Sequence, residues 1–516
     1  MFLFICSLIG LVVQGFIFHL IDPFGYPDTI RYFNLAQFLS SPSIAHFGDY
    51  AHQHGIVFVP LFLPVWLLVG KNMLGLSYEV WGLILQFVSV QIILWFTYLI
   101  ALIAVGKIAA RIALLLLVTH FGFFMLSGFI TSEYPFMALM MITAWFSICW
   151  DSWNVKKFIL LSLLMALLVS IRSQGLVFSF LITGYLVFSK KTKLHQGLFL
   201  LATPIACSLF HLYFFHHLDA RFQETLSSND IVSQSMFFLG DRFADYDFSI
   251  HGIRAILAKE TVVHFFLRQP SVYLTLLTRH LGEFFAFLNK GFVSYYFLAG
   301  ALILSSIRAK IKAKPIFVIW IFGNLLFTIF LLAPSDSIVR YQSSSFPFAI
   351  ILVASAVASG FPSRANLRKT QIYAMVMAGL VLGSYLSYHF LEHKDLYVRW
   401  KSGRYSENLT LKEGAIKSAE LIEEKIGARQ EPIATMSAYD YGTIYRSQHT
   451  PVYLSWGWNR EEIRDYLKTR KINYLIALQD ELGILDRTGI RYEVVAPLTK
   501  RKYPQNQEYL CRFNID

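Results

Sequence analysis

Charged residues are scarce in this sequence. Only 15% of the 516 residues are Asp, Glu, Lys or Arg, whereas soluble domains carry roughly a quarter. Hydrophobic residues make up 55% of the chain, and the mean hydropathy is +0.50. Apolar runs long enough to cross a bilayer recur through residue 390. This composition excludes an ordinary soluble protein and predicts a polytopic α-helical membrane protein.

Cysteine is also rare. The four cysteines show no paired spacing, and three of them lie in apolar segments (Cys6, Cys149, Cys207 and Cys511). A disulfide framework or a zinc site is therefore not expected. The first apolar segment, 2–21, has no basic stretch before it and no small-residue cleavage site ahead of Asp22. We expect it to be a retained helix that also serves as the insertion signal.

The excess of positive charge lies mainly in short loops. The formal net charge of +12 would suggest a nucleic-acid partner in a soluble chain. Here, Lys and Arg cluster between apolar segments, at 107–111, 156–157, 190–193, 308–314 and 364–369. Such clusters set the orientation of membrane spans and mark the cytoplasmic side. We therefore expect no nucleic-acid partner.

The number of spans follows from the length of the apolar runs. A hydrocarbon core of about 30 Å needs roughly 20 helical residues. The run 158–188 is too long for one helix, so we predict two short spans with Arg172 at the turn. The run 54–70 is short and interrupted by Pro60 and Pro64, and the basic loops share one side only if it does not cross. About eleven transmembrane helices are predicted: the two around Arg172 and those at 3–21, 80–105, 111–131, 134–150, 197–214, 292–307, 316–333, 346–361 and 372–390.

This topology divides the chain into a transmembrane module, 1–390, and an outward-facing domain, 391–516. The N-terminus is expected in the cytoplasm, and two large loops, 22–79 and 215–291, on the outer face. After residue 391, the sequence predicts two helices (410–427 and 459–471) and five strands (431–439, 450–456, 473–479, 491–498 and 508–515), hence a small α/β domain. Its aromatic residues either stack on sugars or fill the core (Tyr439, Tyr441, Tyr445, Tyr453, Trp456 and Trp458).

The first outer loop concentrates ionisable residues near the N-terminus. Gly25 and Pro27 predict a turn, and Asp28 stands where the N-cap of a short helix would lie. Arg31 and Tyr32 follow on the same helix. Asp28 either caps this helix or takes part in chemistry.

Other ionisable residues stand at the outer ends of spans. Glu133 precedes one span, Arg172 lies between two, and Arg340 with Tyr341 precedes a later one. Ionisable groups at membrane depth are costly, and they either mark function or pair with one another. Each could form a structural ion pair. Carboxylates and arginines on one face together indicate an anionic substrate and a proton to be moved.

The order of these motifs resembles the GT-C superfamily of membrane glycosyltransferases, in particular the branch that contains protein O-mannosyltransferases and aminoarabinose transferases. Asp28 is followed four residues later by Tyr32 and then by "LAQFL". Glu133 stands at the outer end of a span, Arg172 lies in "IRSQGL", and Arg340 lies in "VRYQSSSFPFAIIL". The resemblance covers about residues 1–390.

The resemblance implies transfer of a sugar from a polyprenyl-phosphate donor to an acceptor hydroxyl on the outer or periplasmic face. Asp28 takes the place of the general base, and a single displacement inverts the anomeric centre. Arginines would stabilise the departing phosphate. Arg340 is the first candidate, and Arg172, Arg31, His54 and Tyr341 are further ones.

One position departs from the pattern. Relatives often carry a second acid directly after the first, whereas this chain has Thr29. A pair of adjacent carboxylates can bind a divalent cation or share a proton, and Asp28 with Thr29 cannot. We therefore predict chemistry without a metal or other cofactor, with Glu133 and Asp22 as candidate acid partners.

Other classes of function remain open on the sequence. A transporter or flippase of lipid-linked glycans typically shows internal repeats and charges near the membrane midplane, whereas here no repeat is found and the charges cluster at span ends. A glycan polymerase or ligase would use a lipid diphosphate donor. A non-catalytic assembly factor is the third alternative. The enzyme interpretation places a multi-pass protein in a bacterial inner membrane, with a lipid, glycan or protein acceptor.

Overall fold

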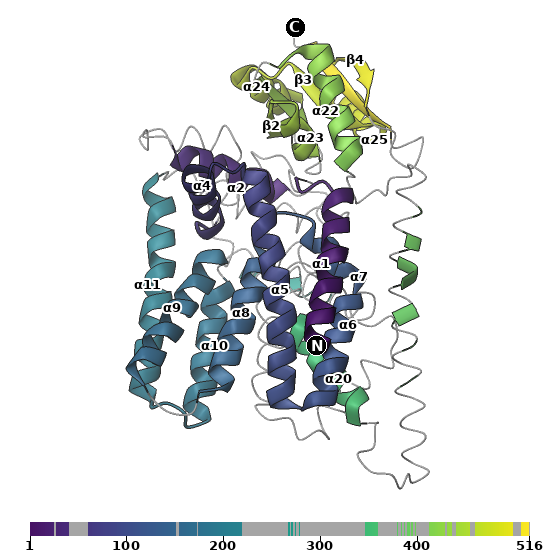
Figure 1. Ribbon diagram of the computed structural model, residues 1–516. Helices are drawn as coiled ribbons and strands as arrows, with labels where there is room; N and C mark the ends of the chain where they lie inside the picture. Colours follow the sequence, from purple (N-terminus) through teal and green to yellow (C-terminus); the bar gives the residue numbers. More distant parts are fainter. Residues whose placement is uncertain are drawn as a thin grey trace.

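The computed structural model of the chain describes two parts, a helical bundle and a smaller α/β domain at one end of it (Figure 1). The described residues are 1–24, 27–40, 60–150, 154–172, 174–218, 346–359, 412–428, 431–435, 440–454, 460–498 and 507–514, with isolated positions in 267–278 and 379–398.

Apolar helices build the bundle. Three of them, α1 (Phe2–Leu20), α5 (Tyr78–Ala104) and residues 194–211 of α11 (Leu194–Leu218), are long and apolar enough to cross a membrane. Outward-facing side chains such as Phe4 and Val12 are 66% and 67% exposed, which is typical of a lipid-facing surface and unfavourable in water. The chain is an integral membrane protein.

Most predicted spans within the described residues correspond to helices. The runs 3–21, 80–105, 134–150, 197–214 and 346–361 match α1, α5, α8 (Glu133–Ile148), α11 and α20 (Phe346–Ser359). The run 158–188 divides at Arg172 as predicted, into α9 (Val155–Ile171) and α10 (Gln174–Phe188). The spans 292–307 and 316–333, and most of 372–390, lie outside the described residues. The count of eleven therefore stays a prediction.

The segment 111–131 consists of two helices rather than the one span predicted. α6 (Lys107–Thr119) ends before His120, and α7 (Phe121–Ser127) begins after it. The Nδ1 atom of His120 accepts a hydrogen bond from the Phe123 amide at 3.0 Å. First-turn amides of a helix have no partner within the helix, so a side-chain acceptor at the N-cap stabilises a new start.

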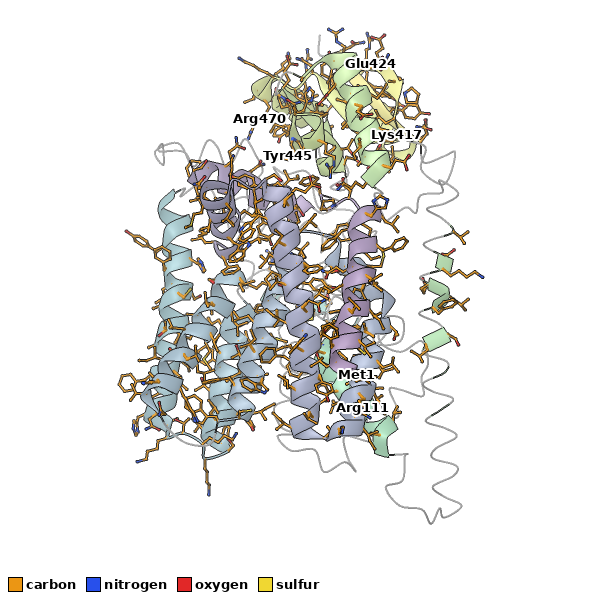
Figure 2. The ribbon with its side chains drawn as sticks, viewed as in Figure 1. Met1, Arg111, Lys417, Glu424, Tyr445 and Arg470 are labelled. Atoms are coloured by element: carbon orange, nitrogen blue, oxygen red, sulfur yellow. The ribbon has the colours of Figure 1, made fainter. Side chains whose placement is uncertain are left out.

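The two ends of the bundle are chemically distinct. Lys191 donates to the carbonyl oxygens of Ile148 and Ser147 at 2.9 and 3.2 Å, where a cation suits the C-terminal end of α8. Glu133 begins the same helix at its other end. Met1 and Arg111 lie at the end of the bundle far from Tyr445 of the C-terminal domain (Figure 2). Which side of the membrane each end faces stays a prediction.

The first outer loop forms a layer between the bundle and the C-terminal domain. α2 (Pro27–Leu39) packs against α4 (Phe62–Leu74) at the end of the bundle nearest that domain (Figure 1). α4 has 13 residues, so it is about 20 Å long at 1.5 Å per residue, shorter than a bilayer core. Whether 54–70 crosses the membrane stays a prediction. The rest of the loop, 41–59, lies outside the described residues.

The C-terminal domain is a mixed five-stranded sheet with helices. The strands β1 (Pro432–Thr435), β2 (Thr450–Tyr453), β3 (Tyr474–Leu478), β4 (Tyr492–Pro497) and β5 (Glu508–Phe513) lie in the order β2-β1-β3-β5-β4. β1 pairs in parallel with β2 and β3, whereas β5 is antiparallel to β3 and β4. All five strands were predicted. The division of the chain at residue 390 lies among residues that are only partly described and stays a prediction.

Four helices accompany this sheet. α22 (Lys412–Ile426) buries Ala415, Ala419 and Ile422 on one face, and Gly427 ends it at a φ of +78°, as is usual at helix C-termini. α22 and α24 (Arg460–Arg470) were predicted, whereas α23 (Tyr441–Arg446) and α25 (Gln479–Thr488) were not. α23 contacts α2 of the membrane module.

Candidate active site

Asp28 lies in the first turn of α2. The helix begins at Pro27, a residue whose fixed φ suits the first helical position. Asp28 is therefore one residue inside the helix and not the N-cap that the sequence predicted, and its carboxylate is favoured by the positive end of the helix dipole. Arg31 Nη1 lies 3.2 Å from Asp28 Oδ1, and these two side chains are 29% and 24% exposed respectively. The Asp28 carboxylate is thus both oriented and accessible.

Tyr32 points into the protein. It is 4% exposed, and its hydroxyl donates to Ser132 Oγ at 3.0 Å. Burial raises the pKa of the Tyr32 phenol, and the nearby negative charges of Asp28 and Glu133 raise it further. The phenol stays protonated at neutral pH, so it acts as a hydrogen-bond donor.

Arg172 and Glu133 form a buried ion pair beside Tyr32. Arg172 Nη1 lies 2.7 Å from Glu133 Oε1, with side chains only 10% and 4% exposed. The same Nη1 donates to Ser132 Oγ at 3.3 Å. Ser132 therefore links Tyr32 of α2 to Arg172 between α9 and α10. Three segments that are far apart in the sequence meet here, at the end of the bundle that faces the C-terminal domain.

The backbone of this network is fixed by two buried side chains. The Thr29 hydroxyl donates to the carbonyl oxygen of Ile130 at 2.9 Å and approaches that of Pro23 at 3.3 Å. Gln86 of α5 donates to the Thr131 carbonyl at 2.7 Å. Thr29, which replaces the second acid of the related pattern, thus has a structural contact of its own.

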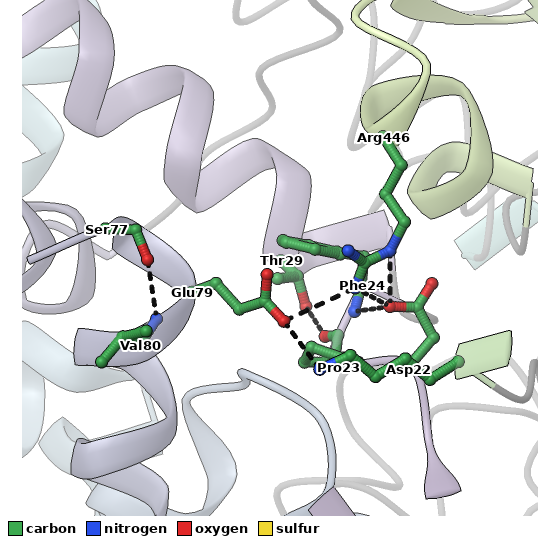
Figure 3. A network of polar contacts seen from close by, with 9 residues as sticks. Asp22, Pro23, Phe24, Thr29, Ser77, Glu79, Val80 and Arg446 are labelled. Carbon is green, nitrogen blue, oxygen red and sulfur yellow. Dashed lines mark hydrogen bonds and ion pairs between the residues drawn. The ribbon is translucent and has the colours of Figure 1, made fainter. Parts of the chain in front are cut away.

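The other candidate residues are placed differently. Asp22 contacts Arg446 of the C-terminal domain, with 2.5 Å between Oδ1 and Nη2 (Figure 3), and it does not join the Glu133 network. Arg340, Tyr341 and His54 lie outside the described residues. In the part of the chain that the structure describes, no three His, Cys, Asp or Glu side chains are grouped so as to hold a metal ion. Chemistry without a metal stays a prediction.

Two residues that form polar contacts in this region were not predicted from the sequence. Ser132 has a local signal, since a serine directly before an acid is typical of a helix start, but its contacts with Tyr32 and Arg172 come from distant segments. Arg446 has no local signal, because its partner Asp22 is 424 residues away.

The fold defined by this bundle, its outer loop and its C-terminal domain is GT-C-like, as predicted. The chain is similar to the crystal structure of ArnT from Cupriavidus metallidurans bound to undecaprenyl phosphate, with 14% identity, a TM-score of 0.54 and coverage of 99% of this chain and 97% of that one. Apo ArnT gives 14% identity and a TM-score of 0.56, covering 98% and 97% of the two chains. An oligosaccharyltransferase from Archaeoglobus fulgidus gives 12% identity and a TM-score of 0.52, covering 93% and 69%.

These similarities concern the fold alone, because the identities are low. No protein-family model matches the chain, and neither does any curated protein.

Proposed function

We propose that this chain is a membrane glycosyltransferase that moves a sugar from a polyprenyl-phosphate donor to an acceptor hydroxyl at the outer face of the membrane. The observation that carries this proposal is the meeting of Asp28, Tyr32, Glu133 and Arg172 at one end of the bundle. An accessible carboxylate lies beside a buried arginine network there. The likeness to ArnT, which was crystallised with undecaprenyl phosphate, supports a donor of this class. The archaeal oligosaccharyltransferase was solved with a dolichol-phosphate and a peptide.

In the proposed reaction, Asp28 is the general base. The acceptor oxygen bonds to the anomeric carbon while the bond from that carbon to the phosphate oxygen breaks. The acceptor proton moves to the Asp28 carboxylate, and the electron pair of the broken bond stays on the phosphate. One displacement of this kind inverts the anomeric centre. Asp28 suits this step because it is 24% exposed and is held by Arg31.

The departing phosphate gathers negative charge, so cations near it stabilise the transition state. We assign this function to Arg172 and Arg31, together with Arg340 and His54. Tyr341 would donate a hydrogen bond to the same phosphate. A guanidinium has five N–H donors arranged in a plane, so Arg172 holds Glu133 with one edge and a phosphate with another. Glu133 thereby acts as an anchor for Arg172 rather than as a second base.

The proposal also covers the membrane, the acceptor and the metal requirement. We place the protein in a bacterial inner membrane, with the active site and the C-terminal domain in the periplasm. The acceptor is a lipid, a glycan or a protein, and Asp28 works without a metal ion.

The test is transfer of radiolabelled sugar from defined polyprenyl-phosphate donors by purified protein in nanodiscs. A general base contributes about 10²- to 10⁴-fold, so we expect Asp28→Asn to lower the rate by that factor. Asp465→Asn, an exposed acid on α24, is the matched control and should leave the rate unchanged. A fully active Asp28→Asn variant refutes the base assignment. Movement of the labelled lipid across the membrane without transfer favours the flippase alternative.

A further inference from the structure

The C-terminal domain is attached to the first outer loop by the last residue of α23. Arg446 donates to Asp22 Oδ1 from Nε at 3.1 Å and from Nη2 at 2.5 Å (Figure 3). The Asp22 side chain is fully buried and that of Arg446 is 14% exposed. Burial raises the pKa of the Asp22 carboxyl, and the Arg446 guanidinium opposes that shift. The contact is thus a desolvated, two-nitrogen ion pair and not a surface salt bridge.

Aromatic side chains extend this contact to α2. The Arg446 guanidinium lies 4.2 Å from the centroid of the Phe24 ring. Phe24 meets Phe33 of α2 edge to face at 5.4 Å, and Tyr445 lies 5.5 Å from Phe24 and 5.9 Å from Phe33. Phe33 directly follows Tyr32 in the sequence. The C-terminal domain therefore contacts the same helix that carries Asp28.

α23 lies too close to Phe24 for any side chain at Gly442. A Cβ atom on Gly442 would lie 2.7 Å from the Phe24 Cβ and 2.9 Å from its carbonyl oxygen. Such distances essentially never occur, so only glycine allows the two backbones to come this close.

A third attachment involves α5. Arg446 Nη2 lies 3.6 Å from Glu79 Oε1, in the first turn of α5, and Lys412 Nζ lies 3.3 Å from the same oxygen. Arg446 thus links Asp22 to the first turn of α5.

We propose that Arg446 is a positioning residue, which acts from the C-terminal domain through Asp22 and Phe24 to hold α2 and its Asp28 in place. Only four residues separate Asp22 from Pro27, where α2 begins. Holding Asp22 and Phe24 therefore fixes the origin of the helix, and the Phe24–Phe33 contact fixes its rotation. The expected effect on the transfer rate rests on the proposed function, whereas the expected effect on the order of α2 does not.

The structural test is hydrogen exchange of the amides of 27–39 in the full chain in nanodiscs. We expect Arg446→Gln to raise exchange in α2 at least tenfold while exchange in β1 and β3 is unchanged. Gly442→Ala changes no charge and should have the same effect by displacing α23. Lys417→Gln, which removes an exposed ion pair with Glu413 on α22, is the control and should change nothing in α2. Unchanged α2 exchange in both Arg446→Gln and Gly442→Ala, with the domain folded, overturns the proposal.

A double-mutant cycle tests whether Arg446 acts through Asp22. Residues that act through one contact are not additive, so we expect Asp22→Asn with Arg446→Gln to be no worse than Arg446→Gln alone. In the transfer assay, misplacing a base affects the chemical step. Arg446→Gln should therefore lower kcat at least tenfold with less than a threefold change in the KM for the donor, and Arg446→Lys should recover part of the rate. Additive effects, or a change confined to KM, contradict positioning through Asp22.

The two proposals fail separately. An active Asp28→Asn variant refutes the base assignment but leaves the exchange result to decide the function of Arg446. A rigid α2 in Arg446→Gln refutes the positioning of α2 and leaves the base assignment intact.

Discussion

Replacing Thr29 by aspartate tests whether a second acid, which relatives often carry at this position, stays protonated in this protein. Thr29 is fully buried, and its hydroxyl faces the carbonyl oxygens of Ile130 and Pro23 at 2.9 and 3.3 Å. An ionised carboxylate at this position would face two acceptors and could donate to neither. We expect the introduced carboxyl to stay protonated, because the neutral acid retains one O–H donor for these oxygens.

The cost follows from the pKa of an ordinary aspartate, about 3.9. A site that keeps the group neutral raises its folded-state pKa, so the penalty is absent below about pH 4 and grows with pH. Each pH unit above 3.9 adds about 1.36 kcal/mol until the folded-state pKa is reached. Between pH 5 and pH 7, the free energy of unfolding of Thr29→Asp relative to wild type should fall by about 2.7 kcal/mol.

The assay is SDS unfolding in mixed micelles, followed by tryptophan fluorescence at pH 5 and pH 7. Thr29→Val keeps the shape and adds no ionisable group, so its loss of about 1–3 kcal/mol should be the same at both values. A Thr29→Asp variant with a pH-independent free-energy difference from wild type refutes the placement of Thr29 against the two carbonyls.

Two further predictions concern the buried network. Tyr32→Phe removes the hydrogen bond to Ser132, and we expect a loss of about 1 kcal/mol in the same unfolding assay, with a smaller fall in transfer rate than in Asp28→Asn. Arg172→Met removes one partner of a buried ion pair and should cost about 3–5 kcal/mol. The joint change with Glu133→Leu should restore most of that stability but not the transfer activity. An Arg172→Met variant as stable as wild type contradicts a buried pair.

The sequence predicted those features that depend on run length and local composition. The turn at Arg172 followed because the largely apolar run 158–188 has 31 residues, more than one helix needs to cross a bilayer. The strands of the C-terminal domain followed from short apolar segments between turn residues. Glu133 was placed at the start of a span because a charge there avoids the membrane interior.

Run length and composition did not predict features that depend on a single side-chain contact. His120 lies in an apolar stretch that has the composition of a single span, and the break arises from its ring nitrogen accepting from the Phe123 amide. α23 is only six residues long, too short to be stable without tertiary contacts. It depends on packing against Phe24 and Asp22, which no local pattern records.

The helices next to the network are short. α8, α9 and α10 have 16, 17 and 15 residues, so they extend about 22–26 Å, less than a hydrocarbon core of about 30 Å. α5 has 27 residues, and its upper end rises well above those of α8 and α10 (Figure 1). α8, α9 and α10 therefore fall short of the hydrocarbon core by roughly one helical turn. Local thinning of the bilayer relieves such a mismatch. For the polyprenyl-phosphate donor proposed above, such thinning would let the phosphate approach Arg172 at the end of α9 while its isoprenoid tail stays in the membrane.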